Sequence, residues 1–198
     1  GLLVGTLAMG VSVLILWLVG AYRVTEFGLT GQILVGLLIS VGAAVSEELF
    51  FRGVMLHTLA VRFGAWPAMI VVSIVFGMIH ATNPGAGLWG GFAIVLSAGL
   101  LLNAAYLLTG NLWMPIGIHF AWNFVQSGVF GITVSGTTEQ RGLFASEMVG
   151  PTWLTGGTMG IEGSVVLIAV GLITGLALAI RGTVSGALRR DRLVLDAP

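Results

Sequence analysis

The chain has 198 residues, of which 57% are hydrophobic and only 8% are charged, and its mean hydropathy is +1.04. Soluble domains carry about 25% charged residues, so this composition excludes an ordinary soluble protein and indicates a membrane protein. Eight arginines and eight acidic residues balance to zero formal charge, which argues against a nucleic-acid partner, and the lack of cysteine excludes disulfides and Cys-ligated metals.

Six apolar runs follow one another along the chain, and we expect each to form a helix that crosses the lipid bilayer. A helix needs about 20 apolar residues to cross ~30 Å of hydrocarbon, and the second run is so long that it must tilt, bend or project. The sequence therefore predicts an all-α fold, a polytopic transmembrane helix bundle of about six spans in a single domain. The predicted spans are 2–21, 31–63, 66–81, 88–108, 112–130 and 164–180.

Two connections are expected to lie outside the membrane, the short polar segment 22–30 and the Gly/Thr-rich segment 131–163. Arginine placement gives an orientation, because cytoplasmic loops of membrane proteins are enriched in basic residues. It predicts that both termini are cytoplasmic, in what we expect to be a prokaryotic plasma membrane. The arginines predicted inside are Arg62, Arg181, Arg189, Arg190 and Arg192, and those predicted outside are Arg23 and Arg141.

The chain starts at Gly1 within an apolar run, which we interpret as a processed chain or a fragment that lacks upstream spans.

The second run contains an unusual polar cluster, Ser-Glu-Glu-Leu-Phe-Phe-Arg at 46–52. An ionisable side chain at bilayer depth costs about 2.5–3.5 kcal/mol, so three together indicate a function. Glu48 and Arg52 are four residues apart on one helix face, with the acid first, which is the better order for an ion pair. Glu47 lies ~100° around the helix from Glu48, so we expect it to face a cavity instead.

Two later runs carry further polar groups: His80 ends the third, and His119 and Asn123 lie four residues apart in the fifth. Along ideal helices, Glu47 lies ~22 Å from Arg62 and His80 lies ~21 Å from Trp66. If both spans start at the same membrane surface, Glu47 and His80 lie at the same depth. His119 lies only ~9 Å beyond the start of its span, so helix lengths alone leave its approach to this pair open.

These side chains suit peptide hydrolysis, which needs a base to activate water, an acid for the leaving amine and donors for the oxyanion. A carboxylate beside an imidazole supplies the first two, and His and Asn side chains supply the third. Glu47, His80 and His119 also match the ligand count of a catalytic zinc site. No His-Glu-x-x-His motif is present. We favour direct Glu/His catalysis, and zinc remains the alternative.

The ordered motifs Glu-Glu-x-x-x-Arg, Phe-x-x-x-His and His-x-x-x-Asn, within 46–123, resemble the CPBP family of intramembrane proteases, also called Abi or CAAX-protease-like. That family includes endopeptidases that trim prenylated CAAX proteins and bacterial relatives linked to bacteriocin processing or immunity. The resemblance implies a helical fold with a site buried between spans and a membrane-associated protein or peptide as substrate. It also implies that Glu47 and His80 activate water and that His119 and Asn123 complete the site. The motif residues that it carries over are Glu47, Glu48, Arg52, His80, His119 and Asn123.

Two other classes of function stay open. Buried acids, histidines and arginine also line proton or ion pathways in transporters, although the sequence has neither paired broken helices nor an internal repeat. A catalytically silent membrane scaffold or immunity protein is the second alternative. Outside the motifs, we expect Asn103 to form interhelical hydrogen bonds and His57 to lie at the membrane interface. Packing roles are expected for Phe50, Phe51, Phe76 and Phe120.

Overall fold

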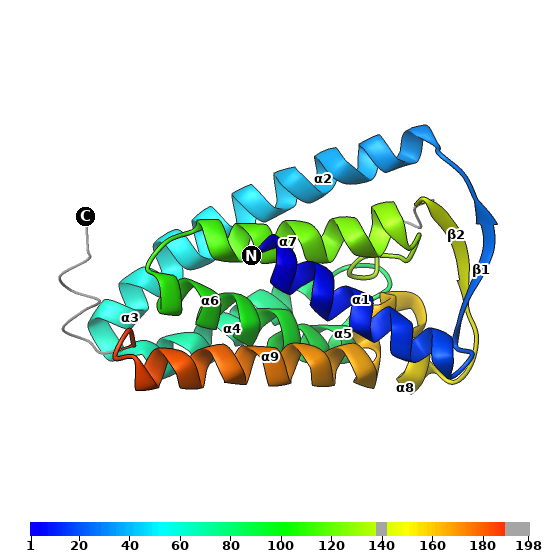
Figure 1. Cartoon of the computed structure of the whole chain (residues 1–198). Helices are drawn as coiled ribbons and strands as arrows, with labels where there is room; N and C mark the ends of the chain where they lie inside the picture. The colour runs from blue at the N-terminus through cyan, green and yellow to red at the C-terminus, as the bar shows by residue number, and fades with distance from the viewer. Residues whose placement is uncertain (138–141, 189–198) are drawn as a thin grey trace.

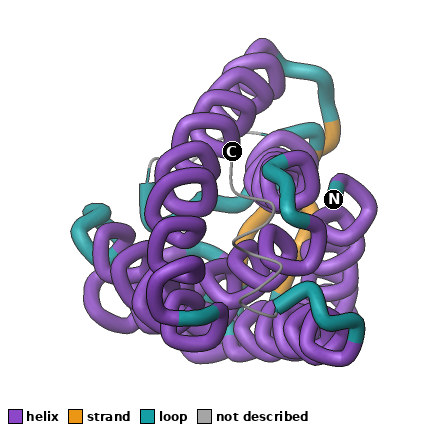
Figure 2. Tube along the Cα trace, turned by 90° about the vertical axis from the view of Figure 1, so that its left-hand side faces the viewer, coloured by secondary structure: helices purple, strands orange, loops and turns teal. Residues whose placement is uncertain are grey.

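The computed structural model describes residues 1–137 and 142–188, and it is a helix bundle with a small sheet at one end (Figure 1). Three of the arginines used to predict the orientation, Arg189, Arg190 and Arg192, lie outside the described residues, as does Arg141. Within the described part, helices make up most of the chain and the strands are a minor component (Figure 2).

Six helical segments occupy the six predicted runs. Three of them change to π-helix along their length, which alters the direction in which successive side chains point. The segments are α1 (Leu2–Leu18); α2 (Gly31–Glu48) continued by η1 (Leu49–Leu56, π) and α3 (His57–Phe63); α4 (Ala65–His80); α5 (Gly87–Ile94) continued by η2 (Val95–Gly99, π) and α6 (Leu100–Thr109); α7 (Trp113–Phe124) continued by η3 (Val125–Val129, π); and α9 (Val165–Val184).

Three of these helices, Gly31–Phe63, Gly87–Thr109 and Val165–Val184, are long and apolar enough to cross a membrane by length and composition. Two more, Leu2–Leu18 and Ala65–His80, are apolar but shorter. Large apolar side chains also cover the outside of the bundle, where lipid rather than water is the favourable neighbour. Examples are Leu34, Leu38, Ile70, Ile74, Ile173 and Ile180. The protein is therefore an integral membrane protein.

The fold departs from the all-α prediction at the end of the bundle. β1 (Tyr22–Phe27) pairs antiparallel with β2 (Phe144–Met148), so that Tyr22 lies opposite Met148 and Phe27 opposite Phe144. β1 carries aromatic and β-branched residues that fit a pleated surface, whereas β2 offers only Phe144 of this kind. The two connections that the sequence predicts as loops are thus tied to each other (Figure 1).

The segment 131–163 is also more ordered than the predicted loop. It contains β2, the short helix α8 (Thr152–Thr155) and two 3₁₀ turns, η4 (Gly157–Met159) and η5 (Ile161–Gly163). It contacts the turn after α4, because the Gly85 amide donates to the Gly136 carbonyl at 2.8 Å. Trp89 in α5 donates from its indole to the Gly163 carbonyl at 2.9 Å. The segment therefore covers one end of the helix bundle.

Close helix contacts set the position of α4, which carries His80. Gly77 lies one turn before His80, and a Cβ at this residue would lie 2.4 Å from the Gly91 carbonyl oxygen of α5. Only glycine allows α4 and α5 to approach this closely. Elsewhere α6 packs extensively against α9, and α7 lies between α1 and α2. The long second helix thus contacts the bundle partly through α7, the helix that carries His119.

Candidate active site

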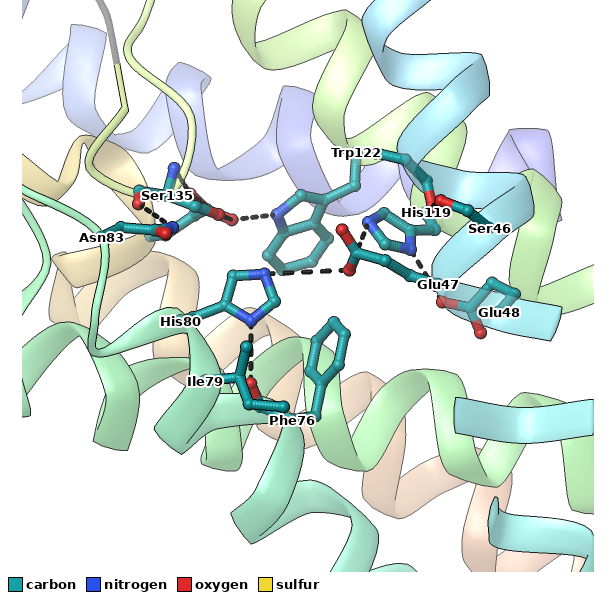
Figure 3. Close-up of polar contacts among 12 residues, drawn as sticks. Ser46, Glu47, Glu48, Phe76, Ile79, His80, Asn83, His119, Trp122 and Ser135 are labelled. Atoms are coloured by element: carbon teal, nitrogen blue, oxygen red, sulfur yellow. Dashed lines mark hydrogen bonds and ion pairs between the residues drawn. The ribbon is translucent and has the colours of Figure 1, made fainter. Parts of the chain in front are cut away.

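The three polar motifs meet where the end of α2, the end of α4 and the middle of α7 come together (Figure 3). Glu47 Oε2 lies 3.9 Å from His80 Nε2 and 4.0 Å from His119 Nε2. Helix lengths along the sequence predict that Glu47 and His80 lie close together, and they leave the position of His119 open. In the structure both imidazoles face the same carboxylate oxygen, and this oxygen accepts no hydrogen bond from the described residues.

The second ring nitrogen of each histidine has a partner that defines the imidazole orientation. His80 Nδ1 lies 2.8 Å from the Phe76 carbonyl oxygen, which only accepts hydrogen bonds, so Nδ1 carries the proton. His119 Nδ1 lies 2.7 Å from Glu48 Oε1 and donates to that carboxylate. In their neutral forms both rings therefore direct the Nε2 lone pair toward Glu47.

Glu48, the neighbouring acid, faces the protein core. Its side chain is 0% exposed and Oε1 accepts from Arg52 Nη1 at 2.8 Å, so the predicted ion pair is present. The same oxygen accepts from His119, a contact that the sequence does not predict. Glu47 is 30% exposed, which matches the expectation that the two acids face different surroundings. Glu48 thus links the guanidinium to the imidazole.

Arg52 lies in η1 and is itself held by groups from other helices. Its Nε donates to Asn103 Oδ1 at 3.0 Å. Asn103 in turn donates to the Met69 carbonyl at 3.1 Å and to Ser73 Oγ at 3.0 Å. The Phe76 ring centroid lies 4.4 Å from the guanidinium carbon, within the range of a cation–π contact. The interhelical role predicted for Asn103 is confirmed, and the residue also supports the ion pair.

A cavity of about 370 Å³ opens in front of Glu47. Its polar lining includes His80, His119 and Asn123, and its apolar lining includes Ile39 and Phe51. Asn123 lies one turn beyond His119 on α7 and is half-buried. The cavity therefore places a carboxylate, two imidazoles and an amide beside an apolar wall, which is the set of groups that the sequence predicts for peptide hydrolysis.

The other side of this cavity is built by residues that the sequence does not single out. Ser135, from the segment predicted as an extramembrane loop, lines it together with Asn83. The Asn83 amide donates to the Ser135 carbonyl at 2.8 Å (Figure 3). Glu162, from the same predicted extramembrane loop, is buried, with 2% of its surface exposed. Its partners lie 27 to 40 residues earlier in the chain, so no local pattern marks it.

The zinc hypothesis requires Glu47, His80 and His119 to form one ligand set. Among the described residues, no group of three His, Cys, Asp or Glu side chains is arranged closely enough to hold a metal ion. The separations of 3.9 and 4.0 Å are too long for direct hydrogen bonds between Glu47 Oε2 and the two Nε2 atoms. The geometry gives no basis for a step through a metal.

The remaining polar and aromatic residues are outside this cluster. His57 Nδ1 lies 3.1 Å from the Tyr106 hydroxyl, and both line a separate cavity of about 610 Å³. Phe51 packs edge-on against Phe76 with ring centroids 5.0 Å apart, as expected for packing residues. Phe76 also lies 6.2 Å from the His119 ring. Phe76 therefore packs against the Arg52 guanidinium and both histidine rings.

Comparison with protein families finds a match over residues 29–125 to a family described as type II CAAX prenyl endopeptidase Rce1-like. The matched segment runs from just before α2 to the first residue of η3, and it contains all six motif residues. Neither the curated proteins nor the solved structures include a match to this chain.

Proposed function

Because the chain belongs to the CPBP family, the CAAX-protease-like intramembrane endopeptidases, we propose that it hydrolyses a peptide bond of a membrane-associated protein or peptide at the cavity in front of Glu47. The family indicates a protease, and its description as a prenyl endopeptidase makes a prenylated CAAX-type peptide the first substrate to test.

One observation carries the proposal: Glu47 Oε2 lies about equally far from the Nε2 atoms of His80 and His119, and all three residues line one cavity. All three atoms are acceptors when the histidines are neutral and the carboxylate is ionised, so a donor placed between them would satisfy all three. A water molecule supplies two hydrogens, and protonation of one imidazole supplies a third. This arrangement favours a water held by a base, which hydrolysis requires.

The proposed reaction starts with a water that donates to Glu47 Oε2 and His80 Nε2. As its oxygen bonds to the carbonyl carbon of the scissile bond, Glu47 takes up one proton. His119 in its protonated form donates from Nε2 to the carbonyl oxygen as this becomes an oxyanion, and Asn123 is the second donor. The proton on Glu47 then passes to the leaving nitrogen while the carbon–nitrogen bond breaks.

Glu48 and Arg52 act as positioning residues in this scheme, because they have no contact with the cavity in front of Glu47. Glu48 accepts from His119 Nδ1, which fixes the orientation of the ring. Arg52 neutralises the buried carboxylate and is anchored by Asn103. A carboxylate that orients a catalytic imidazole serves the same purpose in other hydrolases.

Cleavage by the purified protein tests this function. Reconstituted in liposomes, the protein should release a fragment from a prenylated, membrane-anchored peptide, identified by mass spectrometry, and the Glu47→Gln variant should not. An unprenylated peptide with the same transmembrane anchor separates prenyl recognition from general proteolysis. Proton or ion flux into sealed liposomes, with no cleavage of either peptide, would instead establish the transporter alternative.

We also propose that the six helical segments each cross the bilayer, with both termini cytoplasmic. β1, β2 and the turn that contains Gly85 all meet at one end of the bundle, which fits helices that alternate in direction. The chain has no cysteine, so single cysteines report sidedness directly. A cysteine at Thr25 should react with an impermeant maleimide outside intact cells, and one at Asn111 only after permeabilisation. If the Thr25→Cys and Asn111→Cys variants both react from the same side, six crossings are contradicted. If only Asn111→Cys reacts in intact cells, the orientation is contradicted.

A further inference from the structure

The loop side of the cavity is held by a buried carboxylate that the catalytic scheme does not use. Glu162 in η5 is 2% exposed. Its Oε1 accepts from Trp122 Nε1 at 3.1 Å and its Oε2 accepts from the Ser135 backbone amide. The Ser135 hydroxyl lies 3.0 Å from Oε2, and Gln126 Nε2 lies 3.4 Å from the same oxygen. All of these donors are neutral.

This carboxylate connects two parts of the site that are distant in sequence. Trp122 lies on α7, three residues after His119 and immediately before Asn123. Ser135 belongs to the segment 134–137, which forms one wall of the cavity through Val134, Ser135 and Thr137. Glu162 therefore fixes the distance between the helix that carries the oxyanion donors and the opposite wall of the cavity.

The conformation of Ser135 indicates that the wall needs such support. Ser135 is the only non-glycine residue with a positive φ in the described part of the chain, at 51°. Residues other than glycine adopt this conformation when surrounding contacts fix it. Here the amide and hydroxyl bond to Glu162 and the carbonyl accepts from Asn83. Asn83 lies just beyond His80, so the same wall is tied to the helix of the second catalytic histidine.

We propose that Glu162 is a positioning residue that holds segment 134–137 as the substrate-contacting wall of the cavity. This inference rests on the proposed peptidase function, since it assigns the wall to peptide binding. The carboxylate is required because two donors, the Trp122 indole and the Ser135 amide, approach different oxygens. In the Glu162→Gln variant one of these donors faces an NH₂ group. The wall then loses its fixed position although the packing volume is unchanged.

Two measurements on the purified protein test the proposal. Hydrogen–deuterium exchange of peptides covering residues 132–137 should be about tenfold faster in Glu162→Gln, because glutamine offers one acceptor oxygen where the Trp122 indole and the Ser135 amide need two. In the cleavage assay, KM should rise about tenfold while kcat falls by less than about threefold, because the wall binds substrate but takes no part in bond breaking. A purely structural residue would lower the amount of folded enzyme without changing KM.

Matched controls separate the possible results. Glu147→Gln alters an exposed carboxylate of β2 in the same region and should change neither measurement. Ser135→Ala removes only the hydroxyl contact and should give a smaller KM change than Glu162→Gln. If the wild-type protein cleaves nothing, the proposed function fails and the exchange measurement still tests the wall. Unchanged exchange at 132–137 in Glu162→Gln, or an unchanged KM in a cleaving enzyme, would overturn the proposal.

Discussion

The two faces of the helix at Glu47 and Glu48 contain the same functional group in opposite surroundings. On the cavity face, Glu47 is 30% exposed and no described residue donates a hydrogen bond to its Oε2. On the core face, Glu48 is 0% exposed and its Oε1 accepts from Arg52 and His119. Each acid has one oxygen without a hydrogen-bond donor among the described residues, so the difference between the two lies in their surroundings. Glu47 lines the cavity, whereas Glu48 orients the guanidinium and the imidazole behind it.

His119 contacts both faces, so its removal should have the largest effect. His119→Ala deletes the proposed oxyanion donor and leaves Glu48 with one fewer partner. We expect peptide cleavage to fall by at least about 10³-fold, within the range for removing a catalytic acid–base or oxyanion group. His57→Ala is the matched control, because His57 contacts Tyr106 in a separate cavity. Equal loss of activity in both variants would show that the assay reports general damage to the bundle.

On the core face, Glu48→Gln should lower both stability and activity. Breaking a buried ion pair costs about 3–5 kcal/mol, since it leaves an uncompensated charge. Arg52→Gln should be similarly unstable, and the double variant should lose less than the sum because neither charge then remains unpaired. Thermal unfolding in one detergent measures all three. Strictly additive losses would contradict a direct Glu48–Arg52 pair.

Asn103→Ala tests how far the core-face network extends. The change removes the acceptor of Arg52 Nε and the donor to the Met69 carbonyl and Ser73. We expect a loss of about 1–3 kcal/mol in the free energy of unfolding, the usual result of unsatisfied buried groups. Gln32→Ala, in the exposed first turn of α2, is the control and should stay close to the wild-type unfolding temperature. A wild-type unfolding temperature for Asn103→Ala would limit the network to Glu48 and Arg52.

Metal removal should have the smallest effect. Direct Glu/His catalysis predicts that turnover survives exhaustive chelation and that elemental analysis finds no stoichiometric zinc. In the described part of the chain, no three His, Cys, Asp or Glu side chains are arranged to hold a metal ion, and this observation motivates the test. If chelation abolishes turnover and zinc alone restores it, Glu47 acts as a zinc ligand and not as a free base.

The predictable part of this site is the part that depends on local spacing. Glu48 and Arg52 pair because four residues bring two side chains onto one helix face, and this spacing can be read directly from the chain. The same geometry separates Glu47 from the pair. The six helical segments also follow from apolar runs, since each run must be buried in the bundle or in lipid. Local rules therefore account for the helices and for the division between the two acids.

The remaining features depend on contacts between distant segments. β1 forms only because β2 lies beside it, with Thr25 bonded to the carbonyl of Ala145, 120 residues later. Glu162 appears in the sequence as one acid in a Gly-rich connection, and only the folded chain brings Trp122 and Ser135 to it. The contact between His119 and Glu48 likewise requires the relative heights of two helices, which span lengths do not fix.

The most direct test of the division between the two acids compares Glu47→Gln with Glu48→Gln in one preparation. Cleavage rate and unfolding temperature are measured for both variants in the same detergent. We predict that Glu47→Gln unfolds at the wild-type temperature and has no measurable turnover, whereas Glu48→Gln unfolds at a clearly lower temperature. A stable, inactive Glu48→Gln beside an unstable Glu47→Gln would contradict the account and exchange the roles of the two carboxylates.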